Sequence, residues 1–160
     1  MSNIKFWEWD KKPRTMLRFV KPGDIFCFSL GDGKYYFGRI ISKSIVGHIV
    51  EIFNFISEEN KINQDIIESA HRLIPPFVLD SYLLFDKKYE KDADWRIIGH
   101  QSNYTPSGVD NIYFSYGLGD GCKKVDVFGN EFPITEKEAS VLPPLSPHSS
   151  YHVRKLMEST

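Results

Sequence analysis

Hydrophobic side chains in the first third of the chain fall into three short runs separated by turn residues. Residues 25–30 (IFCFSL), 34–41 (KYYFGRII) and 48–56 (HIVEIFNFI) are rich in the aromatic and β-branched side chains that favour strands. Residues 21–24 (KPGD) precede the first run and residues 31–33 (GDG) separate the first two, and both sequences are typical of tight turns. The pattern predicts a three-stranded antiparallel meander.

The middle of the chain predicts further elements with a less regular pattern. Gly38, inside the second run, indicates a bulge or a tight bend. Apolar side chains at helical spacing in residues 65–74 favour a short helix, with a strand as the alternative. Residues 77–85 (FVLDSYLLF) and 95–100 (WRIIGH) predict strands on either side of a charged loop, 86–94, and these two strands would close the meander into a barrel.

The last third of the chain predicts two short strands followed by helical segments. The strands are expected at residues 112–116 and 124–128. Thr135 is placed to cap the N-terminus of a helix, with Glu138 at the capping-box position. A last short helix is expected over residues 150–157.

Together these elements predict a mainly β (α+β) fold. We expect a small antiparallel SH3-like barrel or a strongly bent sheet, with one or two short helices and a C-terminal appendage. The chain divides into an N-terminal arm (1–20), a β-rich barrel domain (21–133) and a helical or irregular appendage (134–160) that packs on the same domain.

Composition narrows the function to that of a binding protein. Hydrophobic residues make up 41% of the chain and aromatic residues 14%, which is enough for a packed core. The chain has 20 Lys and Arg against 21 Asp and Glu, so it lacks the overall basic charge that drives nucleic-acid binding. We therefore expect no direct binding to nucleic acid. The N-terminal sequence lacks the apolar region of a secretory signal, and the apolar runs are shorter than a membrane span. We therefore expect a cytoplasmic protein without membrane contact.

The sequence has no motif typical of an enzyme. His148 and His152 are four residues apart, but Pro147 and the serine pair between them argue against a shared helix face, and no other histidines have metal-ligand spacing. No serine lies in a Gly-x-Ser-x-Gly sequence. Cys27 and Cys122 are expected to be reduced thiols, with Cys27 buried in a strand. We therefore expect no catalytic residue, no metal and no cofactor.

Two groups of motifs resemble a known family. Residues 21–40 combine a KPGD turn, an apolar strand and a hairpin return that contains Gly-Arg, and residues 47–53 (GHIVEIF) begin the third strand with Gly-His. Residues 82–85 (YLLF) and 95–99 (WRIIG) are similar to a strand, charged loop and Trp-led strand of the same family. The chain thus resembles the immunity protein 26 family of bacterial toxin systems over roughly its first two thirds.

The resemblance implies an antitoxin that binds one cognate toxin domain, in a 1:1 complex in the cytoplasm, and blocks its active site or its access to substrate. Such toxins are often nucleases with basic clefts, so the inhibitor would present acidic and aromatic side chains. The candidate toxin-binding residues are the acidic Glu58, Glu59, Asp65, Glu68, Asp86, Glu90, Asp92 and Asp94 and the aromatic Tyr89 and Tyr104.

Two other functions fit parts of the same pattern. The Gly-Asp turn, apolar strand and Gly-rich hairpin are also similar to small-barrel ribonuclease toxins of the MazF/PemK kind, but residues 38–41 (GRII) have one Arg where those toxins have an Arg-Arg-Pro-like return strand. Alternatively, a barrel could bind a peptide or a nucleic acid through Tyr35, Tyr36 and Phe37. The sequence shows no cluster of basic residues that would form the groove that nucleic-acid binding requires.

Overall fold

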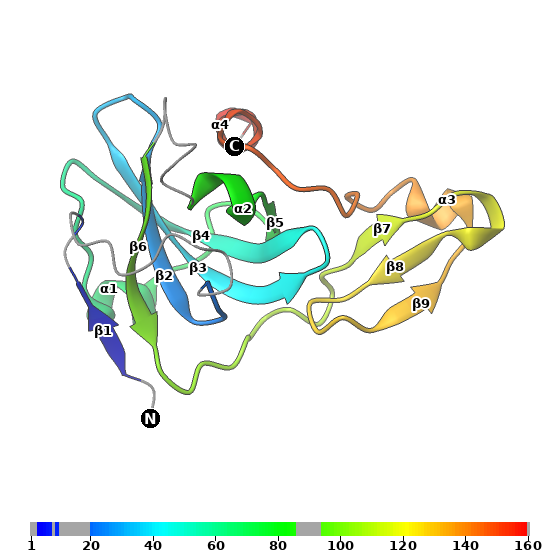
Figure 1. Ribbon diagram of the computed structural model, residues 1–160, viewed down its shortest axis with the longest axis horizontal. Coiled ribbons are helices and arrows are strands. Elements are labelled where there is room, and N and C mark those ends of the chain that lie inside the picture. The colour runs from blue at the N-terminus through cyan, green and yellow to red at the C-terminus, as the bar shows by residue number, and fades with distance from the viewer. Residues whose placement is uncertain (1–2, 8, 10–19, 86–93, 160) are drawn as a thin grey trace.

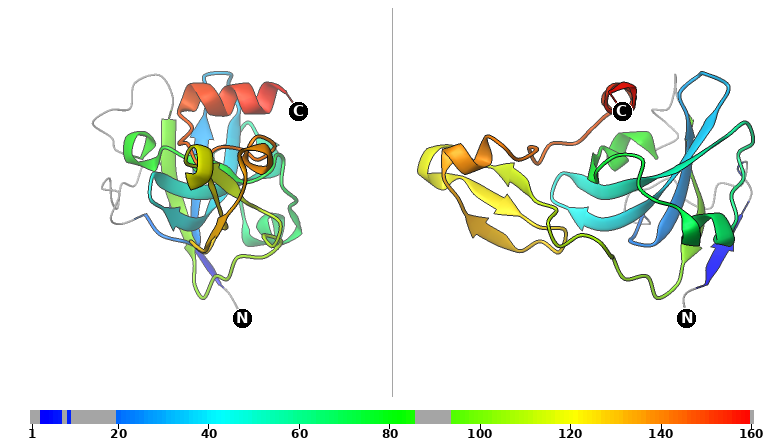
Figure 2. Two further views of the ribbon diagram at one scale, coloured as in Figure 1. Left: turned by 90° about the vertical axis from the view of Figure 1, so that its right-hand side faces the viewer. Right: turned by 180° about the vertical axis from the view of Figure 1, so that it is seen from behind.

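The computed structural model describes residues 3–7, 9, 20–85 and 94–159 of the chain (Figure 1). In these residues the chain forms a six-stranded and a three-stranded antiparallel sheet, with short helices. The two sheets lie next to each other along the long axis of the molecule, and the second sheet extends from the tip of the β3–β4 hairpin (Figures 1 and 2). The predicted mainly β (α+β) fold is therefore confirmed, but the described residues contain four short α-helices where one or two were expected.

The larger sheet is open rather than closed into a barrel. In order across the sheet, its strands are β1 (Ile4–Phe6), β6 (Asp94–Gln101), β2 (Asp24–Ser29), β3 (Tyr35–Ser44), β4 (Gly47–Ser57) and β5 (Phe77–Leu79). Strands β1 and β5 are the two edges, and within the described residues they do not pair with each other. The predicted barrel closure is wrong because β5 pairs with β4 while β6 pairs with β2, on opposite sides of the meander.

The predicted strand over residues 77–85 is correct only in its first three residues. The side chain of Asp80 accepts a hydrogen bond from the backbone N–H of Leu83 and caps the short helix α2 (Ser81–Leu84). An aspartate in this position stabilises a helix start and so ends the strand. The shorter β5 covers only residues 48–50 of β4.

The predicted hairpin is confirmed in detail. Gly31 and Gly33 have φ angles of +83° and +77°, which glycine adopts at no steric cost.

The predicted bulge at Gly38 is also found. The register between β3 and β4 shifts around Gly38, as expected for a bulge. A Cβ atom at Gly38 would collide with the backbone oxygen of Glu51 and the ring of Phe26, so only glycine fits there.

Strand β2 is buried on both faces of the sheet. On one face, Phe28 stacks on Trp95 with their ring centroids 4.0 Å apart, and Phe26 stacks beside them. On the other face, Ile25 and Cys27 lie in a second apolar cluster, which includes Ile67 of helix α1 (Gln64–Ser69). A strand buried on both faces has a continuous apolar sequence, which is what residues 25–28 show.

The smaller sheet contains β7 (Phe114–Tyr116), β8 (Lys123–Val125) and β9 (Glu131–Pro133), with a 3₁₀ turn, η2 (Gly119–Gly121), between the first two. Strand β8 ends before the predicted residue 128 because the side chain of Asp126 accepts hydrogen bonds from the N–H groups of Phe128 and Asn130 and forms a turn. A third apolar cluster connects the two sheets. It includes Ile41, Ile49 and Val78 from the first sheet, Phe114 from β7 of the second sheet, and Val127 from the turn between β8 and β9.

The C-terminal segment returns from the second sheet to the first. Thr135 and Glu138 form the predicted capping box of helix α3 (Glu136–Ala139). The chain then leads to α4 (Ser150–Glu158), where Val153 is fully buried and Arg154 donates a hydrogen bond of 2.6 Å to the carbonyl of Leu30. Helix α4 thus covers the face of the large sheet that carries Trp95. None of the described helices is long and apolar enough to cross a membrane.

Candidate functional site

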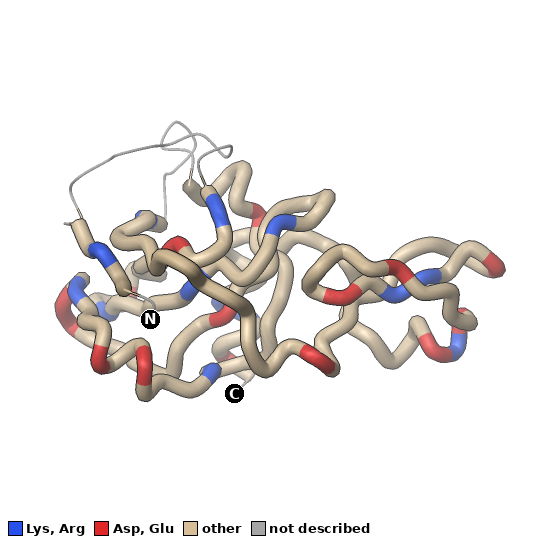
Figure 3. Tube along the Cα trace, turned by 90° about the horizontal axis from the view of Figure 1, so that it is seen from below, with Lys and Arg blue, Asp and Glu red and all other residues tan. Residues whose placement is uncertain are grey.

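Four of the predicted acidic residues form an exposed surface around α1. Glu58 and Glu59 follow β4, and Asp65 and Glu68 lie on the helix, all four exposed. We call these four residues the acidic surface. Residues 57–70 contain only one basic residue, Lys61, so the local charge is negative although the whole chain is nearly neutral. Figure 3 shows that acidic positions also occur elsewhere along the chain, so negative charge is not confined to the acidic surface.

The local sequence explains why these carboxylates face solvent. The side chain of Asn63 accepts a hydrogen bond of 2.9 Å from the N–H of Ile66 and starts α1. Ile67 is 4% exposed and fixes the apolar side of the helix against the sheet. The opposite side, which carries Asp65 and Glu68, therefore faces outward, and Gln64 donates a hydrogen bond to Glu68 along the helix.

Part of the predicted site lies outside the described residues. This applies to Asp86, Tyr89, Glu90 and Asp92. Asp94 is the first residue of β6, where its backbone lies opposite Ser29, and its side chain is outside the description. The charged loop therefore stays a prediction from the sequence.

Tyr104, the remaining predicted residue, packs against a charged network. Its ring lies 4.8 Å from the guanidinium carbon of Arg39. Burial, supported by the negative charge of Glu51, raises the pKa of the Tyr104 hydroxyl to about 12, against the opposing effect of Arg39 and Arg72. Tyr104 is half-buried, so it supports the network and is not a freely exposed aromatic side chain.

The network is centred on Glu51, a carboxylate inside β4 with a side chain that is only 6% exposed. Its two oxygens accept hydrogen bonds of 2.8 Å from Nε of Arg39 and Nε of Arg72. A buried carboxylate is tolerated only when it is paired in this way. The cross-strand position of Arg39 opposite Glu51 shows why both charges occur inside apolar strands.

The two arginines extend the network to other segments. Arg39 donates a hydrogen bond of 2.7 Å to the side chain of Gln101 at the end of β6. Arg72 donates to the backbone carbonyls of Ser107 and Gly108, at 2.8 and 2.7 Å, and so holds the long connection between β6 and β7. The sequence analysis missed this network, because its members are charged residues far apart in the chain.

A polar cavity of about 710 Å³ lies between the network and α1. Its lining includes Arg39, Glu51, Arg72, Gln64, Glu68 and His71. The structure thus brings Glu68, of the acidic surface, to the same cavity as Arg39, on which Tyr104 packs. The cavity can accept a polar or charged side chain of a partner at the edge of the acidic surface.

Three groups that could serve catalysis are engaged in the fold or buried. The guanidinium of Arg39, on which the ribonuclease alternative depended, is bonded to Glu51 and Gln101 and so serves the fold. Cys27 and Cys122 are free and buried, and burial raises the pKa of the Cys27 thiol, which keeps it in the unreactive protonated form. No cluster of three or more potential metal ligands occurs in the described part of the chain.

Asp24, which is buried, and the half-buried His100 form a pair with a structural role. The carboxylate of Asp24 lies 2.8 Å from Nδ1 of His100 and accepts a hydrogen bond from the N–H of Lys21. Burial raises the pKa of Asp24, and the bonds from Lys21 and His100 oppose that effect. The pair fixes the KPGD turn to β6, as expected for an aspartate that caps a local turn.

Comparison with known proteins identifies one family. Residues 21–126 match the model of a family described as immunity protein 26. The match covers more than half of the chain, from the KPGD turn to the residue that follows β8. None of the curated proteins and none of the solved structures matches the chain.

Proposed function

Because the chain belongs to the immunity protein 26 family, we propose that it neutralises its toxin in the cytoplasm. It binds the toxin domain one to one and occludes the active site of the toxin or its access to substrate. Family membership implies toxin neutralisation, and such immunity proteins are typically non-enzymatic inhibitors. The family match is the observation that carries this proposal.

We further propose that the toxin is a nuclease and that it meets the acidic surface. A nuclease must hold a phosphate backbone, so the surface around its active site is basic. Four carboxylates against one lysine in residues 57–70 complement such a surface. All four are exposed, and only Glu68 among them has a described side-chain hydrogen bond, from its neighbour Gln64, so three carboxylates retain their full capacity to accept bonds from a partner.

The proposed interface extends from the acidic surface to the polar cavity beside it. Glu68 lies at the junction of the two. Tyr104 supports the cavity wall through Arg39. On its sequence alone, the charged loop that contains Asp86, Tyr89, Glu90, Asp92 and Asp94 has four carboxylates and three lysines and could also meet the same toxin.

Co-expression tests the proposal. The toxin domain encoded beside the gene of this chain is expressed in bacteria with and without the chain. We expect the toxin to stop growth and the chain to restore it. An inactive toxin variant should co-purify with the chain in a 1:1 complex, and unrestored growth with no complex would exclude this toxin–immunity pairing.

Charge reversal tests the role of the acidic surface. We expect the double variant Glu58→Lys/Glu59→Lys to slow association with the inactive toxin several-fold at low salt, and less at high salt, because exposed charges steer association. Glu136→Lys on α3 is a matched control, since Glu136 is also an exposed carboxylate but belongs to the other sheet region. Equal association rates for the double variant, the control and the unmodified chain would remove the acidic surface from the interface.

A further inference from the structure

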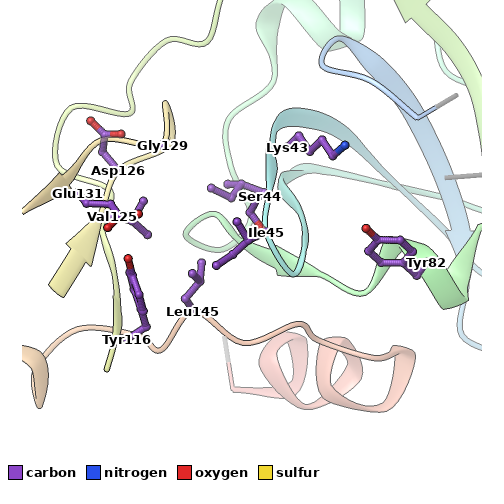
Figure 4. A pocket seen from close by; sticks show the side chains of 11 residues that line it. Lys43, Ser44, Ile45, Tyr82, Tyr116, Val125, Asp126, Gly129, Glu131 and Leu145 are labelled. Atoms are coloured by element: carbon purple, nitrogen blue, oxygen red, sulfur yellow. The ribbon is translucent and has the colours of Figure 1, made fainter. Parts of the chain in front are cut away.

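A second cavity, of about 430 Å³, lies between the two sheets (Figure 4). We call it the inter-sheet cavity. The tip of the β3–β4 hairpin and α2 contribute Lys43, Ser44, Ile45 and Tyr82 on one side, and the second sheet contributes Tyr116, Val125, Asp126 and Glu131 on the other, with Leu145 between them. Cavities of this size hold several side chains of a ligand.

Two large side chains that line the cavity are exposed to solvent. Ile45 is 78% exposed and Tyr82 is 54% exposed. Ile45 lies in a tight turn, where Ser44 already supplies the local hydrogen bond to the N–H of Val46, so a polar residue would serve the turn equally well. Exposed apolar side chains grouped around a hollow are typical of a protein-binding surface.

The charges around the cavity distinguish its two sides. On the second sheet, Asp126 and Glu131 carry negative charge. The pKa of the Glu131 carboxyl is lowered, chiefly by a hydrogen bond from Tyr116 and also by Lys123. Burial raises the pKa of the Asp126 carboxyl, but hydrogen bonds from Asn130 and neighbouring backbone N–H groups outweigh this effect and lower it. Glu131 shares its negative charge with Lys123, 3.4 Å away, and Lys43 carries positive charge on the opposite side of the cavity. The charge available to a basic group is therefore on Asp126 and, in part, on Glu131.

The second sheet also gives the cavity a wall that the family match does not include. The match ends at residue 126, whereas Gly129, Glu131 and Leu145 line the cavity from beyond that limit. The hairpin side of the cavity, with Ile45 and Ile49, lies within the match. The cavity is therefore built partly from residues within the family match and partly from residues beyond it.

We propose that the inter-sheet cavity anchors the cognate toxin domain by receiving a large apolar side chain, next to a lysine or arginine, from a surface loop of that domain. The apolar side chain lies against Ile45 and Tyr82, and the basic one pairs with Asp126 and Glu131. This inference rests on the proposed function, since it takes the partner to be a toxin. A few buried anchors of this kind supply most of the binding energy of a protein interface and lengthen the life of the complex.

Affinity measurements with matched variants test the anchor. The probe is the inactive toxin domain encoded beside the gene of this chain. We expect Ile45→Asp and Tyr82→Ala each to weaken its binding at least about tenfold. Val141→Asp is the control, because Val141 is 81% exposed, like Ile45, but lies outside the cavity, and it should change the affinity less than about twofold.

The charge at the cavity is tested separately. Glu131→Gln should weaken binding about threefold to tenfold, because it removes one of the two carboxylates that meet the basic side chain. Glu136→Gln, at an exposed carboxylate of α3 outside the cavity, should leave the affinity unchanged. Thermal unfolding of every variant shows whether it is folded.

The outcomes separate this inference from the proposed function. If the unmodified chain neither binds nor neutralises the toxin, the proposed function fails and the inference fails with it. If the unmodified chain binds and folded Ile45→Asp and Tyr82→Ala variants bind equally well, the cavity is not the anchor and the proposed function stands. If Ile45→Asp instead converts a dimer into a monomer without changing toxin affinity, the cavity serves a contact between copies of the chain and the inference is wrong.

Discussion

The six-stranded sheet and the three-stranded sheet differ in where they place apolar and charged side chains. The first is covered on both faces, so that Trp95 is 1% exposed and the charge of Glu51 is paired inside the structure. The second is a thin layer in which Leu118 is 89% exposed, Phe128 61% and Phe132 40%. The sequence of the first sheet is therefore constrained by folding, whereas much of the second is free to meet a partner.

The difference suggests a division of roles within the chain. The large sheet supplies stability and positions the acidic surface and the tip of the β3–β4 hairpin at the surface of the molecule. The small sheet adds a wall to the inter-sheet cavity, partly from residues beyond the family match. We therefore expect substitutions in the first sheet to act mainly on stability and substitutions on the exposed face of the second to leave stability almost unchanged.

The largest loss of stability is expected for Trp95→Ala. The indole stacks on Phe28 and Phe26 and contacts the ring of Phe85, so its removal leaves a cavity in the core. We expect the free energy of unfolding to fall by about 4 kcal/mol, measured by urea denaturation. Trp95→Phe keeps one stacked ring and should lose about half as much. A loss below about 1 kcal/mol for Trp95→Ala would mean that this sheet does not dominate stability.

The next largest effect is expected for Glu51→Gln. The substitution keeps the shape of the side chain but leaves the charges of Arg39 and Arg72 without their carboxylate. We expect a loss of about 3 kcal/mol in the free energy of unfolding, because breaking a buried ion network leaves uncompensated charge. Glu68→Gln, at an exposed carboxylate, should change it by less than about 0.5 kcal/mol. Equal effects of the two substitutions would contradict a structural role for the network.

A smaller, pH-dependent effect is expected from His48. Its ring is 1% exposed and lies 2.6 Å from the hydroxyl of Ser81, and burial lowers its pKa from 6.5 to about 4. Between these values the unfolded chain takes up a proton that the folded chain does not, so stability falls as the pH is lowered from about 6.5 to 4. We expect a loss of about 2.5 kcal/mol over this range.

The His48→Gln variant isolates that contribution. It should lose less stability than the unmodified chain when urea denaturation at pH 7 is compared with denaturation at pH 4.5. Other groups titrate in both proteins, so the difference between the two belongs to His48. Identical pH dependence would show that the histidine is not held neutral in the folded chain.

The smallest effect is expected for the exposed side chains in the turns between the strands of the second sheet. Phe128→Ser and Leu118→Ser should each change the free energy of unfolding by less than about 0.5 kcal/mol, because neither side chain is buried. Thermal and urea unfolding measure both variants. A loss as large as that of Glu51→Gln would show that the second sheet depends on these side chains and would remove the contrast between the two regions.

Local sequence chemistry predicted the parts of the fold that depend on near neighbours. The KPGD turn, the GDG hairpin, the bulge at Gly38 and the capping box of Thr135 with Glu138 all follow from residues a few positions apart. The predicted barrel closure was wrong because it depended on long-range contacts of β5 and β6. The strand predicted over residues 77–85 was too long because Asp80, which caps α2, was taken as part of it. Cross-chain pairing is set by tertiary packing, which the local pattern does not contain.

The candidate site was predictable to a similar extent. The polar sequence around α1 gave the exposed positions of Glu58, Glu59, Asp65 and Glu68. The Glu51 network and the inter-sheet cavity were missed, because each joins residues far apart in the chain, such as Ile45 and Leu145. A charged residue inside an apolar strand, such as Glu51 in β4, is the one sequence signal that could have indicated the network.

The most direct test of the account is a titration of toxin activity. The purified toxin domain encoded beside the gene of this chain is mixed with increasing amounts of the purified chain, and its nuclease activity is measured. We predict that activity falls in proportion to the added chain and disappears at one chain per toxin, as for a tight 1:1 inhibitor. Full activity in the presence of a saturating excess of the chain would contradict it.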